Sequence, residues 1–373
     1  MALYKSLVKK VSIPADKKTK QKEYEEVGQL AIIDQGKKLI GGYTNNFNMQ
    51  LECTLPVIIF GDHTCAVKYV DFPFGAGADG IKVLSPKDEV LPKYLFYGTQ
   101  YLTLRFPDRG YARHYQHIEK MDLRLPELEE QLRIVKRIEE LFSELDKGVE
   151  TLQIIKQQLT VYKQAVLKEA LSEQQYPIVK IRDACSEIVD CPHSTPKWVD
   201  TGYLCLRTTN FKRGFLDLTE PNYVSKETFN IRNKRLVPRS GDILYSREGS
   251  ILGIACIIPE GITPCLGQRM MLLRASDKLN NKFLMHYLNS PMVTNHVITT
   301  KGGTGSPHIN VGDIKNFDIP IPSIEQQERI VALIEKKFSI CDSIEQTVDT
   351  AFLQAEAMRQ SILKKAFEGE LSE

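Results

Sequence analysis

A segment of about fifty residues occurs twice in this chain, and this repeat restricts the possible folds more than any other feature. Residues 122–171 align on residues 318–367 without a gap. Both copies contain a Glu-x-Gln-x-Arg-Ile-Val run, from Glu129 to Val135 and from Glu325 to Val331. Because matches continue to the far end of the segment, we expect two copies of one structural element.

Each copy has the sequence pattern of one long helix. A proline, Pro126 or Pro322, stands where an extended segment gives way to the helix, a position that tolerates the fixed φ of proline. The apolar residues that follow recur at steps of three and four, with a mean of about 3.5, which is typical of a coiled-coil seam. In the first copy they are Leu128, Leu132, Val135, Ile138, Phe142, Leu145, Val149, Leu152, Ile155, Leu159, Tyr162 and Val166.

The two helices are each other's expected partner. A helix of about 45 residues would be about 65 Å long, and its apolar stripe must be buried on another element. The second copy offers a matching stripe. Two unrelated amphipathic helices are the alternative, which the gapless match disfavours.

The repeats divide the chain into four segments: residues 1–121, 122–175, 176–317 and 318–373. The first 23 residues are rich in lysine, and we expect them to form a flexible arm. Residues 24–121 and 176–317 contain short apolar runs broken by glycine, which predict β-rich globular domains with some helix. The strands are expected at 30–33, 55–62, 67–70, 81–84, 203–207, 242–246, 254–258 and 270–274, and the helices at 92–104 and 282–288.

Composition favours a soluble protein of a reducing compartment. No apolar run approaches the length of about 20 residues that spans a membrane, and Met1 to Lys5 lacks the apolar core of a signal peptide. The eight cysteines include no Cys-x-x-Cys pair. Scattered cysteines suit reduced thiols, so we expect a cytoplasmic location.

Charge is distributed unevenly along the chain. Residues 1–121 carry 17 basic and 13 acidic side chains, and residues 178–317 carry 18 and 12. The repeats are acidic, with 8 basic and 11 acidic side chains in 122–177 and 6 and 11 in 318–373. Basic domains on an acidic frame suggest that the domains contact a polyanion. A solvated surface could carry the same imbalance by chance.

Motifs for catalysis or metal binding are poorly developed. Gly75 to Gly80 spells Gly-x-Gly-x-x-Gly, but strand-like residues follow it where a dinucleotide site requires a helix, so a glycine-rich turn is the better interpretation. The chain contains no P-loop, no Gly-x-Ser-x-Gly and no Pro-Pro, the pair that forms part of the base-binding motif of adenine methyltransferases. His63 near Cys65 and Cys191 near His193 lack a second pair at ligand spacing, so we expect neither catalytic residues nor a metal site.

Polar clusters in the globular segments are candidates for contacts with DNA. Arg pairs well with guanine, Asn with adenine, and Lys, Ser and Thr with phosphates. Each cluster could equally be a solvated loop, and the glycine-rich stretch 301–306 could be a plain flexible loop. The candidates are Lys37, Lys38, Tyr43, Asn45, Asn46, His63 and Thr64 in the first domain, and Arg207, Thr208, Asn210, Lys212, Arg213, Arg232, Lys234, Arg235, Arg247, Arg269, Lys301, Thr304 and Ser306 in the second.

The layout resembles the specificity subunit of type I restriction–modification systems, in which two variable recognition domains are separated by two similar helical regions. The Asp-x-x-x-Pro openings at Asp122 and Asp318 and the Glu-x-Gln-x-Arg-Ile-Val runs carry the resemblance, which covers the whole chain except the first 23 residues. The resemblance implies an α+β fold with two target-recognition domains, two long antiparallel coiled-coil helices and a pseudo-two-fold axis.

The resemblance also implies a mechanism. Each domain would read one half of a bipartite site in double-stranded DNA, and the helices would set the spacer. A separation of about 60 Å exceeds one duplex turn of about 34–36 Å, so a split target is natural, and dissimilar domains should read dissimilar half-sites.

Partners and cofactors are implied in the same way. Two methyltransferase subunits using S-adenosylmethionine would dock on the helices, and restriction–translocase subunits using ATP and Mg²⁺ would join them, while this chain holds no cofactor. Two alternatives remain: a coiled-coil adaptor that binds proteins without DNA, and an enzyme that binds a nucleotide at the glycine-rich turn.

Overall fold

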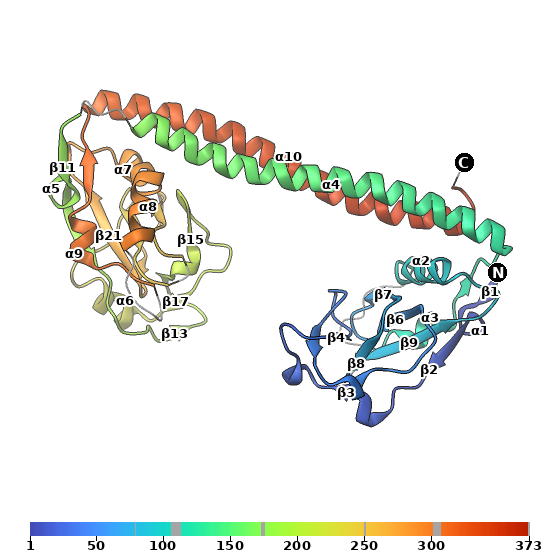
Figure 1. Cartoon of the computed structure of the whole chain (residues 1–373). Coiled ribbons are helices and arrows are strands. Elements are labelled where there is room, and N and C mark those ends of the chain that lie inside the picture. Colours follow the sequence, from blue (N-terminus) through green and yellow to red (C-terminus); the bar gives the residue numbers. More distant parts are fainter. Residues whose placement is uncertain (79, 106–112, 173–175, 250, 301–306, 372–373) are drawn as a thin grey trace. The chain divides into compact units, whose positions relative to one another are not determined.

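The computed structural model describes residues 1–78, 80–105, 113–172, 176–249, 251–300 and 307–371 (Figure 1). The chain forms two compact units. The first unit comprises Met1–Gln153 and Asp349–Glu373, and the second comprises Ile154–Val348. Each unit therefore contains one globular part and a portion of both long helices.

The repeats form the long helices α4 (Leu128–Leu171) and α10 (Ile324–Glu368), as their periodicity predicts. In the second unit, Lys163 Nζ lies 2.8 Å from Asp342 Oδ1, and Lys337 Nζ lies 3.2 Å from Glu169 Oε2. From Lys163 to Glu169 the α4 residue moves toward the end of its helix, while its ion-pair partner on α10 moves from Asp342 back to Lys337. The two helices therefore pair antiparallel (Figure 1).

The same pairing holds in the first unit, where Asp146 of α4 contacts Arg359 of α10. The guanidinium of Arg359 also lies over the ring of Phe142, 4.4 Å from its centroid. Most of the expected seam is at least partly covered, but Leu128, Leu132 and Tyr162 are exposed. Between Leu128 and Leu132 the buried side chain is that of Gln131, which hydrogen-bonds to the globular part. A polar contact therefore decides which face of the first helical turn is buried, and the apolar seam does not.

The first globular part contains two four-stranded sheets. Strands β2 (Val8–Val11), β9 (Ile81–Pro86), β6 (Val57–Gly61) and β7 (Val67–Val70) form an antiparallel sheet in that order. The second sheet has the order β3 (Lys18–Thr19), β8 (Phe74–Gly77), β4 (Leu30–Ile33) and β5 (Gly42–Thr44). Strands β3, β8 and β4 are parallel, and β5 is antiparallel to β4.

The second globular part has a matching antiparallel sheet of β12 (Cys185–Asp190), β21 (Met270–Ala275), β18 (Ile243–Ser246) and β19 (Ala255–Ile257). Its other large sheet has the order β13 (Trp198–Val199), β17 (Tyr223–Val224), β14 (Tyr203–Leu206) and β20 (Cys265–Leu266). Strands β14 and β20 are parallel, like β4 and β8. A hairpin of β15 (Phe211–Lys212) and β16 (Phe215–Leu216) is added.

The helices and short strands around the antiparallel sheets correspond as well. The corresponding helices are α1 (Tyr4–Leu7) and α5 (Ile181–Ala184), α2 (Pro92–Thr103) and α7 (Asn281–Leu288), and α3 (Tyr115–Ile118) and α9 (Val311–Lys315). In the first part β1 (Ala2–Leu3) pairs with β10 (Asp122–Leu123), and in the second part β11 (Ile178–Lys180) pairs with β22 (Asp318–Pro320) in the same antiparallel way. Helices α6 (Lys226–Arg232) and α8 (Pro291–Thr300) belong to the second part. The duplication thus includes the globular parts, whose sequences have diverged more than those of the helices.

The expectation of a flexible N-terminal arm is wrong. Strand β1 pairs with β10, and β2 pairs with β9. Tyr4 and Leu7 are buried, and the Tyr4 hydroxyl lies 2.7 Å from Thr99 Oγ1. The lysines of this segment project from a framework of buried apolar residues, so lysine content alone misled the prediction.

The glycine-rich turn expected at residues 75–80 is a strand over its first part. Gly75 and Gly77 lie in β8, which is buried between β3 and β4. A Cβ on Gly75 would lie 2.6 Å from Ile32 Cδ1. Glycine therefore permits the close approach of β8 to β4.

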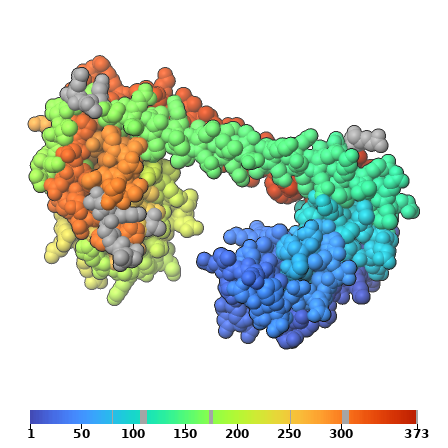
Figure 2. Space-filling model, viewed as in Figure 1, coloured from blue at the N-terminus to red at the C-terminus, as the bar shows by residue number. Residues whose placement is uncertain are grey.

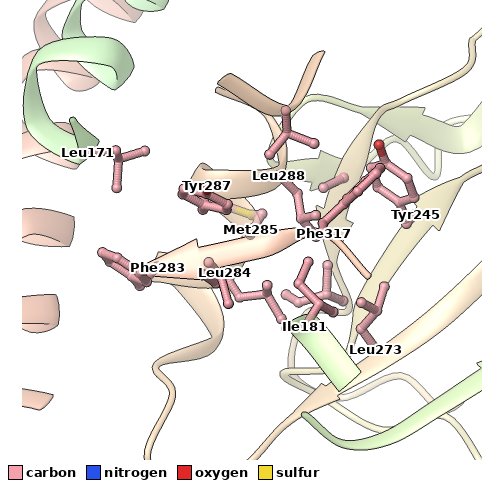
Figure 3. Packing of buried hydrophobic residues seen from close by; sticks show 14 of the residues in the cluster. Leu171, Ile181, Tyr245, Leu273, Phe283, Leu284, Met285, Tyr287, Leu288 and Phe317 are labelled. Carbon is pink, nitrogen blue, oxygen red and sulfur yellow. The ribbon is translucent and has the colours of Figure 1, made fainter. Parts of the chain in front are cut away.

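The apolar cores continue from the sheets into the long helices. In the first unit the cyan surface of α2 lies against the green start of α4 (Figure 2), and Tyr97 of α2 meets Phe142 of α4 at 5.7 Å between ring centroids. In the second unit Figure 3 shows Phe283 and Tyr287 of α7 between the strands and Leu171 of α4. Each globular part is thereby packed onto the helix pair of its own unit.

Candidate nucleic-acid interface

Three loops of the first unit meet at the carboxyl ends of β4, β6 and β8. The Thr64 hydroxyl donates to the carbonyl oxygen of Gln35, which joins the loop after β6 to the loop after β4. The Asp62 amide donates to the Gly80 carbonyl at 2.6 Å, which joins the loop after β6 to the end of the loop after β8. This edge carries four sequence-predicted residues: Lys37, Lys38, His63 and Thr64.

A buried ion pair shapes the loop that carries Lys37 and Lys38. Lys68 Nζ donates to the Asp34 carbonyl oxygen at 2.7 Å and to Asp34 Oδ1 at 3.4 Å. Burial lowers the pKa of the Lys68 ammonium, and the Asp34 carboxylate acts in the opposite direction. Asp34 Oδ1 also accepts from the Gly36 amide at 2.9 Å, so the loop turns sharply and leaves Lys37 and Lys38 exposed.

Tyr43, Asn45 and Asn46 lie on β5 or just after it, outside this group of loops. Asn45 Nδ2 donates to Glu25 Oε2 at 2.7 Å. Asn46 Oδ1 accepts from the Asn48 amide at 3.1 Å, as an N-cap of the short 3₁₀ helix Phe47–Met49. The side chains of Asn45 and Asn46 already have partners in the domain, so for these two residues a role in holding the local backbone fits the structure better than base contact.

Equivalent loops of the second unit meet in the same way. The Gly267 amide donates to the Leu206 carbonyl at 2.9 Å, which joins the ends of β20 and β14. The Arg247 amide donates to the Arg269 carbonyl at 3.0 Å, which brings in the loop after β18. Arg269 Nε lies 3.5 Å from Glu248 Oε1. Both units thus present loops from corresponding strands at one edge.

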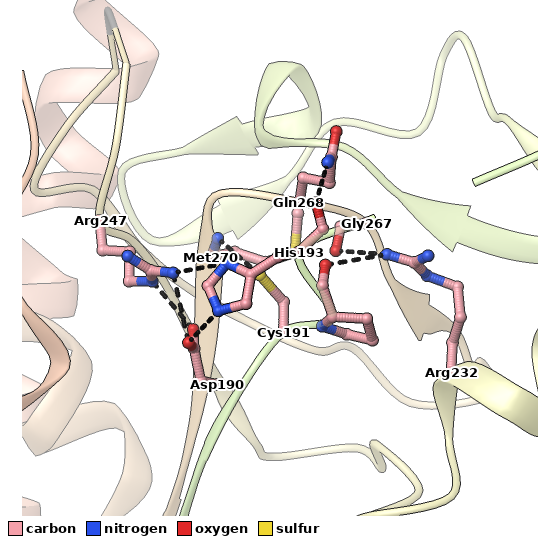
Figure 4. Close-up of polar contacts among 9 residues, drawn as sticks. Asp190, Cys191, His193, Arg232, Arg247, Gly267, Gln268 and Met270 are labelled. Atoms are coloured by element: carbon pink, nitrogen blue, oxygen red, sulfur yellow. Dashed lines mark hydrogen bonds and ion pairs between the residues drawn. The ribbon is translucent and has the colours of Figure 1, made fainter. Parts of the chain in front are cut away.

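Two predicted contact residues of this edge serve the fold. Arg247 is 8% exposed, and its Nε and Nη2 donate to the two carboxylate oxygens of Asp190 at 2.9 and 3.2 Å (Figure 4). His193 Nε2 lies 3.2 Å from Asp190 Oδ2. Asn210 is buried, accepting from the Arg207 amide at 2.8 Å and donating to the Asp217 carbonyl at 3.0 Å. We therefore withdraw Arg247 and Asn210 as DNA contacts.

Arg232 is also withdrawn as a DNA contact, because its guanidinium donates its hydrogen bonds to acceptors inside the domain. It is 7% exposed and donates to backbone carbonyl oxygens from two segments (Figure 4). The acceptors are those of Leu266 at 2.6 Å, Gly267 at 2.9 Å, Ser194 at 3.1 Å and Pro192 at 3.3 Å. This arginine ties α6 to β20 and to the loop after β12, and its neighbours Lys234 and Arg235 remain exposed.

Exposed cations remain around the hairpin and the loop after β14. Arg207, Lys212, Arg213 and Arg269 are exposed, and Thr208 of the short 3₁₀ helix Thr208–Asn210 is partly so. Lys212 Nζ lies 3.7 Å from Asp217 Oδ2, and Arg213 Nη1 donates to Asn289 Oδ1 at 3.4 Å. Lys301, Thr304 and Ser306 lie outside the described residues.

An aromatic side chain escaped the sequence analysis. The guanidinium of Arg207 lies 5.6 Å from the ring centroid of Trp198, which is 39% exposed. The signal was available, since Trp198 is the one tryptophan of the chain and follows Lys197. An exposed aromatic ring beside an arginine is a surface suited to bases and phosphates.

The described part of the chain shows neither a metal cluster nor a membrane span. Among those residues, no three His, Cys, Asp or Glu side chains gather as ligands. None of the helices described has the length and apolar character needed to cross a bilayer.

Two β-rich domains with exposed basic loops, joined to a repeated helix pair, define a class of DNA specificity proteins. The family model for the type I restriction modification DNA specificity domain matches residues 8–157 and 187–351. The chain belongs to this family, and the resemblance seen in the sequence is confirmed.

Two of the curated relatives are specificity subunits of type I restriction enzymes of Escherichia coli. The EcoBI subunit is 28% identical over 278 residues, which are 67% of this chain and 58% of that protein. The EcoR124I/EcoR124II subunit is 23% identical over 352 residues, 90% of this chain and 86% of that protein. The chain thus spans less than two thirds of the length of the first relative.

A solved structure shares the fold. A chain described under "complex assembly and conformational transition of the type I R-M system" has a TM-score of 0.67, with 18% identity and coverage of 99% of this chain and 97% of that chain. The expected α+β architecture with long antiparallel helices is confirmed.

Proposed function

We propose that this chain reads DNA sequence for a type I restriction–modification complex, with one recognition domain for each half of a split target. The observation that carries the proposal is a shared topology with different side chains on corresponding loops. The loop after β4 presents Lys37 and Lys38, whereas the loop after β14 and the β15–β16 hairpin present Arg207, Lys212 and Arg213. Loops that differ on a common scaffold suit two different half-sites.

The chemistry of the exposed loops supports contact with a duplex. Lysines provide point charges for phosphates, whereas arginine can pair through two nitrogens with guanine in the major groove. The Arg207–Trp198 pair adds a flat cationic surface. The exposed residues Lys37, Lys38, Thr64, Arg207, Lys212, Arg213, Lys234, Arg235 and Arg269 remain the proposed contacts, with the partly exposed His63 and Thr208 beside them.

The helices α4 and α10 are the proposed docking frame for partner subunits. Their sequences carry an excess of acidic over basic residues, so repulsion from DNA phosphates favours protein partners there. We propose two methyltransferase subunits that supply S-adenosylmethionine and perform methyl transfer to adenine. Restriction–translocase subunits would supply ATP and Mg²⁺, and this chain would contribute no catalytic residue.

Mapping methylated adenines tests this function. The chain is co-expressed with the methyltransferase of its own system in a host without other adenine methylation, and the genome is sequenced for modified bases. We expect one split motif whose two halves differ. A contiguous motif would contradict the two-domain assignment.

Duplex binding tests the protein-only adaptor alternative. Affinity that falls steeply with salt indicates phosphate contacts by the recognition domains. An assembled complex that neither methylates nor binds duplex DNA would favour the adaptor.

A further inference from the structure

Each globular part is attached to its long helix by a buried glutamine. Gln131 of α4 and Gln327 of α10 occupy the same place in the two repeats, and both side chains are fully buried. A primary amide has two N–H donors and a carbonyl oxygen, so one side chain can join several backbone groups.

The two glutamines make the same three hydrogen bonds. Gln131 Oε1 accepts from the Leu91 amide, and its Nε2 donates to the carbonyl oxygens of Glu89 and Pro126, all at 2.9 Å. Gln327 Oε1 accepts from the Asn280 amide at 2.7 Å. Its Nε2 donates to the carbonyl oxygens of Lys278 at 3.0 Å and Pro322 at 2.9 Å.

The bonds join corresponding points of the fold. Leu91 and Asn280 are the N-cap residues of α2 and α7, the helices that cover the antiparallel sheets. Pro126 and Pro322 precede the first turns of α4 and α10. Each glutamine therefore fixes the start of a domain helix to the start of a long helix.

A second attachment lies two turns further along each long helix. Lys93 Nζ of α2 contacts Glu139 Oε1 of α4 at 2.6 Å, and Lys282 Nζ of α7 contacts Glu335 Oε1 of α10 at 2.7 Å. A glutamine and an ion pair on one face, eight residues apart, hold a domain at two points along its helix. Two attachment points oppose tilting of the domain relative to the helix. Apolar contacts alone would resist this tilting less, because they are non-directional.

We propose that Gln131 and Gln327 are positioning residues that set how strictly the spacer length between the two half-sites is enforced. This inference rests on the proposed function. One added base pair moves a half-site by about 3.4 Å along the duplex and turns it by about 35°. A domain whose angle to its helix is fixed cannot follow that change, whereas a loosened domain follows it at lower cost.

The test uses the whole chain in its methyltransferase complex. Targets carry the mapped half-sites with the natural spacer or with one base pair added or removed, and methylation rates are measured for each. Gln131→Met and Gln327→Met keep the side-chain length and remove the hydrogen bonds. Gln157→Leu, at an exposed glutamine of α4, is the control.

We expect wild type and Gln157→Leu to reject both altered spacers. In Gln131→Met or Gln327→Met, the ratio of the methylation rate on the natural spacer to the rate on an altered spacer should fall by about tenfold. Single-base changes within a half-site should lower the methylation rate as much as they do in wild type. A general loss of stability would lower all rates together and leave the ratios unchanged. Unchanged ratios in both assembled variants would overturn the inference.

A milder variant covers the case in which Gln131→Met fails to assemble. Lys93→Met removes a half-exposed ion pair that the core does not need, and it should shift the spacer ratio in the same direction. An unchanged ratio there, with Gln131→Met unfolded, would also overturn the inference. A contiguous wild-type motif would instead contradict the proposed function, so the two failures are distinguishable.

Discussion

The guanidinium of Arg247 and the carboxylate of Asp190 form a two-point ion pair, with N–O distances of 2.9 and 3.2 Å, beneath the loop edge of the second recognition domain. Both side chains are at least four-fifths buried. The pair ties the loop after β18 to the end of β12, so it stabilises the edge from which the exposed cations project.

Replacing Arg247 by methionine is expected to destabilise the second recognition domain by about 3 kcal/mol, because Asp190 would keep a poorly solvated charge without its partner. A fall of about 6–12 °C in the melting temperature of that domain corresponds to this loss. Arg269→Met, at an exposed neighbour, should change stability by less than about 0.5 kcal/mol. Calorimetry measures the melting temperatures of both variants. Equal melting temperatures would count against a stabilising role of the Arg247–Asp190 ion pair.

Charge removal at the exposed loop tests the DNA surface. In a complex carrying Arg207→Ala, Lys212→Ala and Arg213→Ala, we expect weaker binding, with the salt slope reduced by about 0.9 for each phosphate that is no longer neutralised. Lys364→Ala, at an exposed lysine of α10, is the control. Binding titrations from low to moderate salt measure the slope. An unaltered slope and methylome would remove these residues from the interface.

The N-terminal segment should be essential to the first recognition domain. Leu7 is 1% exposed in the cluster that includes Tyr94 and Tyr101, so Leu7→Ala is expected to cost about 2–5 kcal/mol. Lys5→Ala, at an exposed position of the same helix, should be nearly neutral. Chemical denaturation followed by tyrosine fluorescence reports both. A neutral Leu7→Ala would revive the flexible-arm interpretation.

Acid should weaken the second unit through His286. Burial lowers the pKa of this imidazole from its usual 6.5 to about 4, with Glu335 opposing the shift. Between those values the unfolded chain binds the proton and the folded domain does not, so stability falls as pH drops through this window, by up to about 3 kcal/mol. Stability measured from pH 7 to pH 4 should show the loss.

The first recognition domain supplies the matched variant for that experiment. Tyr97 meets Phe142 edge-on at 5.7 Å, as His286 meets Phe338 at 5.8 Å. His286→Tyr should therefore fit and should remove this part of the pH dependence. An equally steep acid loss in the variant would show that other groups are responsible.

The helices were predictable because a repeat that aligns over fifty positions without a gap leaves little freedom. The recognition domains were harder, since strands such as β13 and β20 have only two residues each, and common topology survives there without common side chains. Their regular strands and the helices α2 and α7 were still found from apolar runs. Gln131 and Gln327 were visible as a matched pair, but nothing in the sequence shows that both amides face a domain.

Which candidate contact residues are exposed was harder to predict, for a physical reason. A cation in a sequence looks the same whether it faces solvent or a carbonyl oxygen. Arg232 and Arg247 meet internal partners, whereas Arg207 and Lys212 are exposed, and only the fold separates these cases. The lysines of the first 23 residues misled in the opposite direction, since they flank buried residues such as Tyr4.

One aromatic cluster ties an early segment of the chain to a late one. Phe367, which leaves the ribosome long after the sheets of the first recognition domain, stacks on Tyr101 at 5.4 Å and meets Tyr94 at 4.9 Å in the core of that domain. The domain synthesised first must therefore wait for the final turns of α10 before its interior closes. A premature stop codon just ahead of the codon for Phe367 would destabilise the first recognition domain, even though every codon for its sheets had been translated.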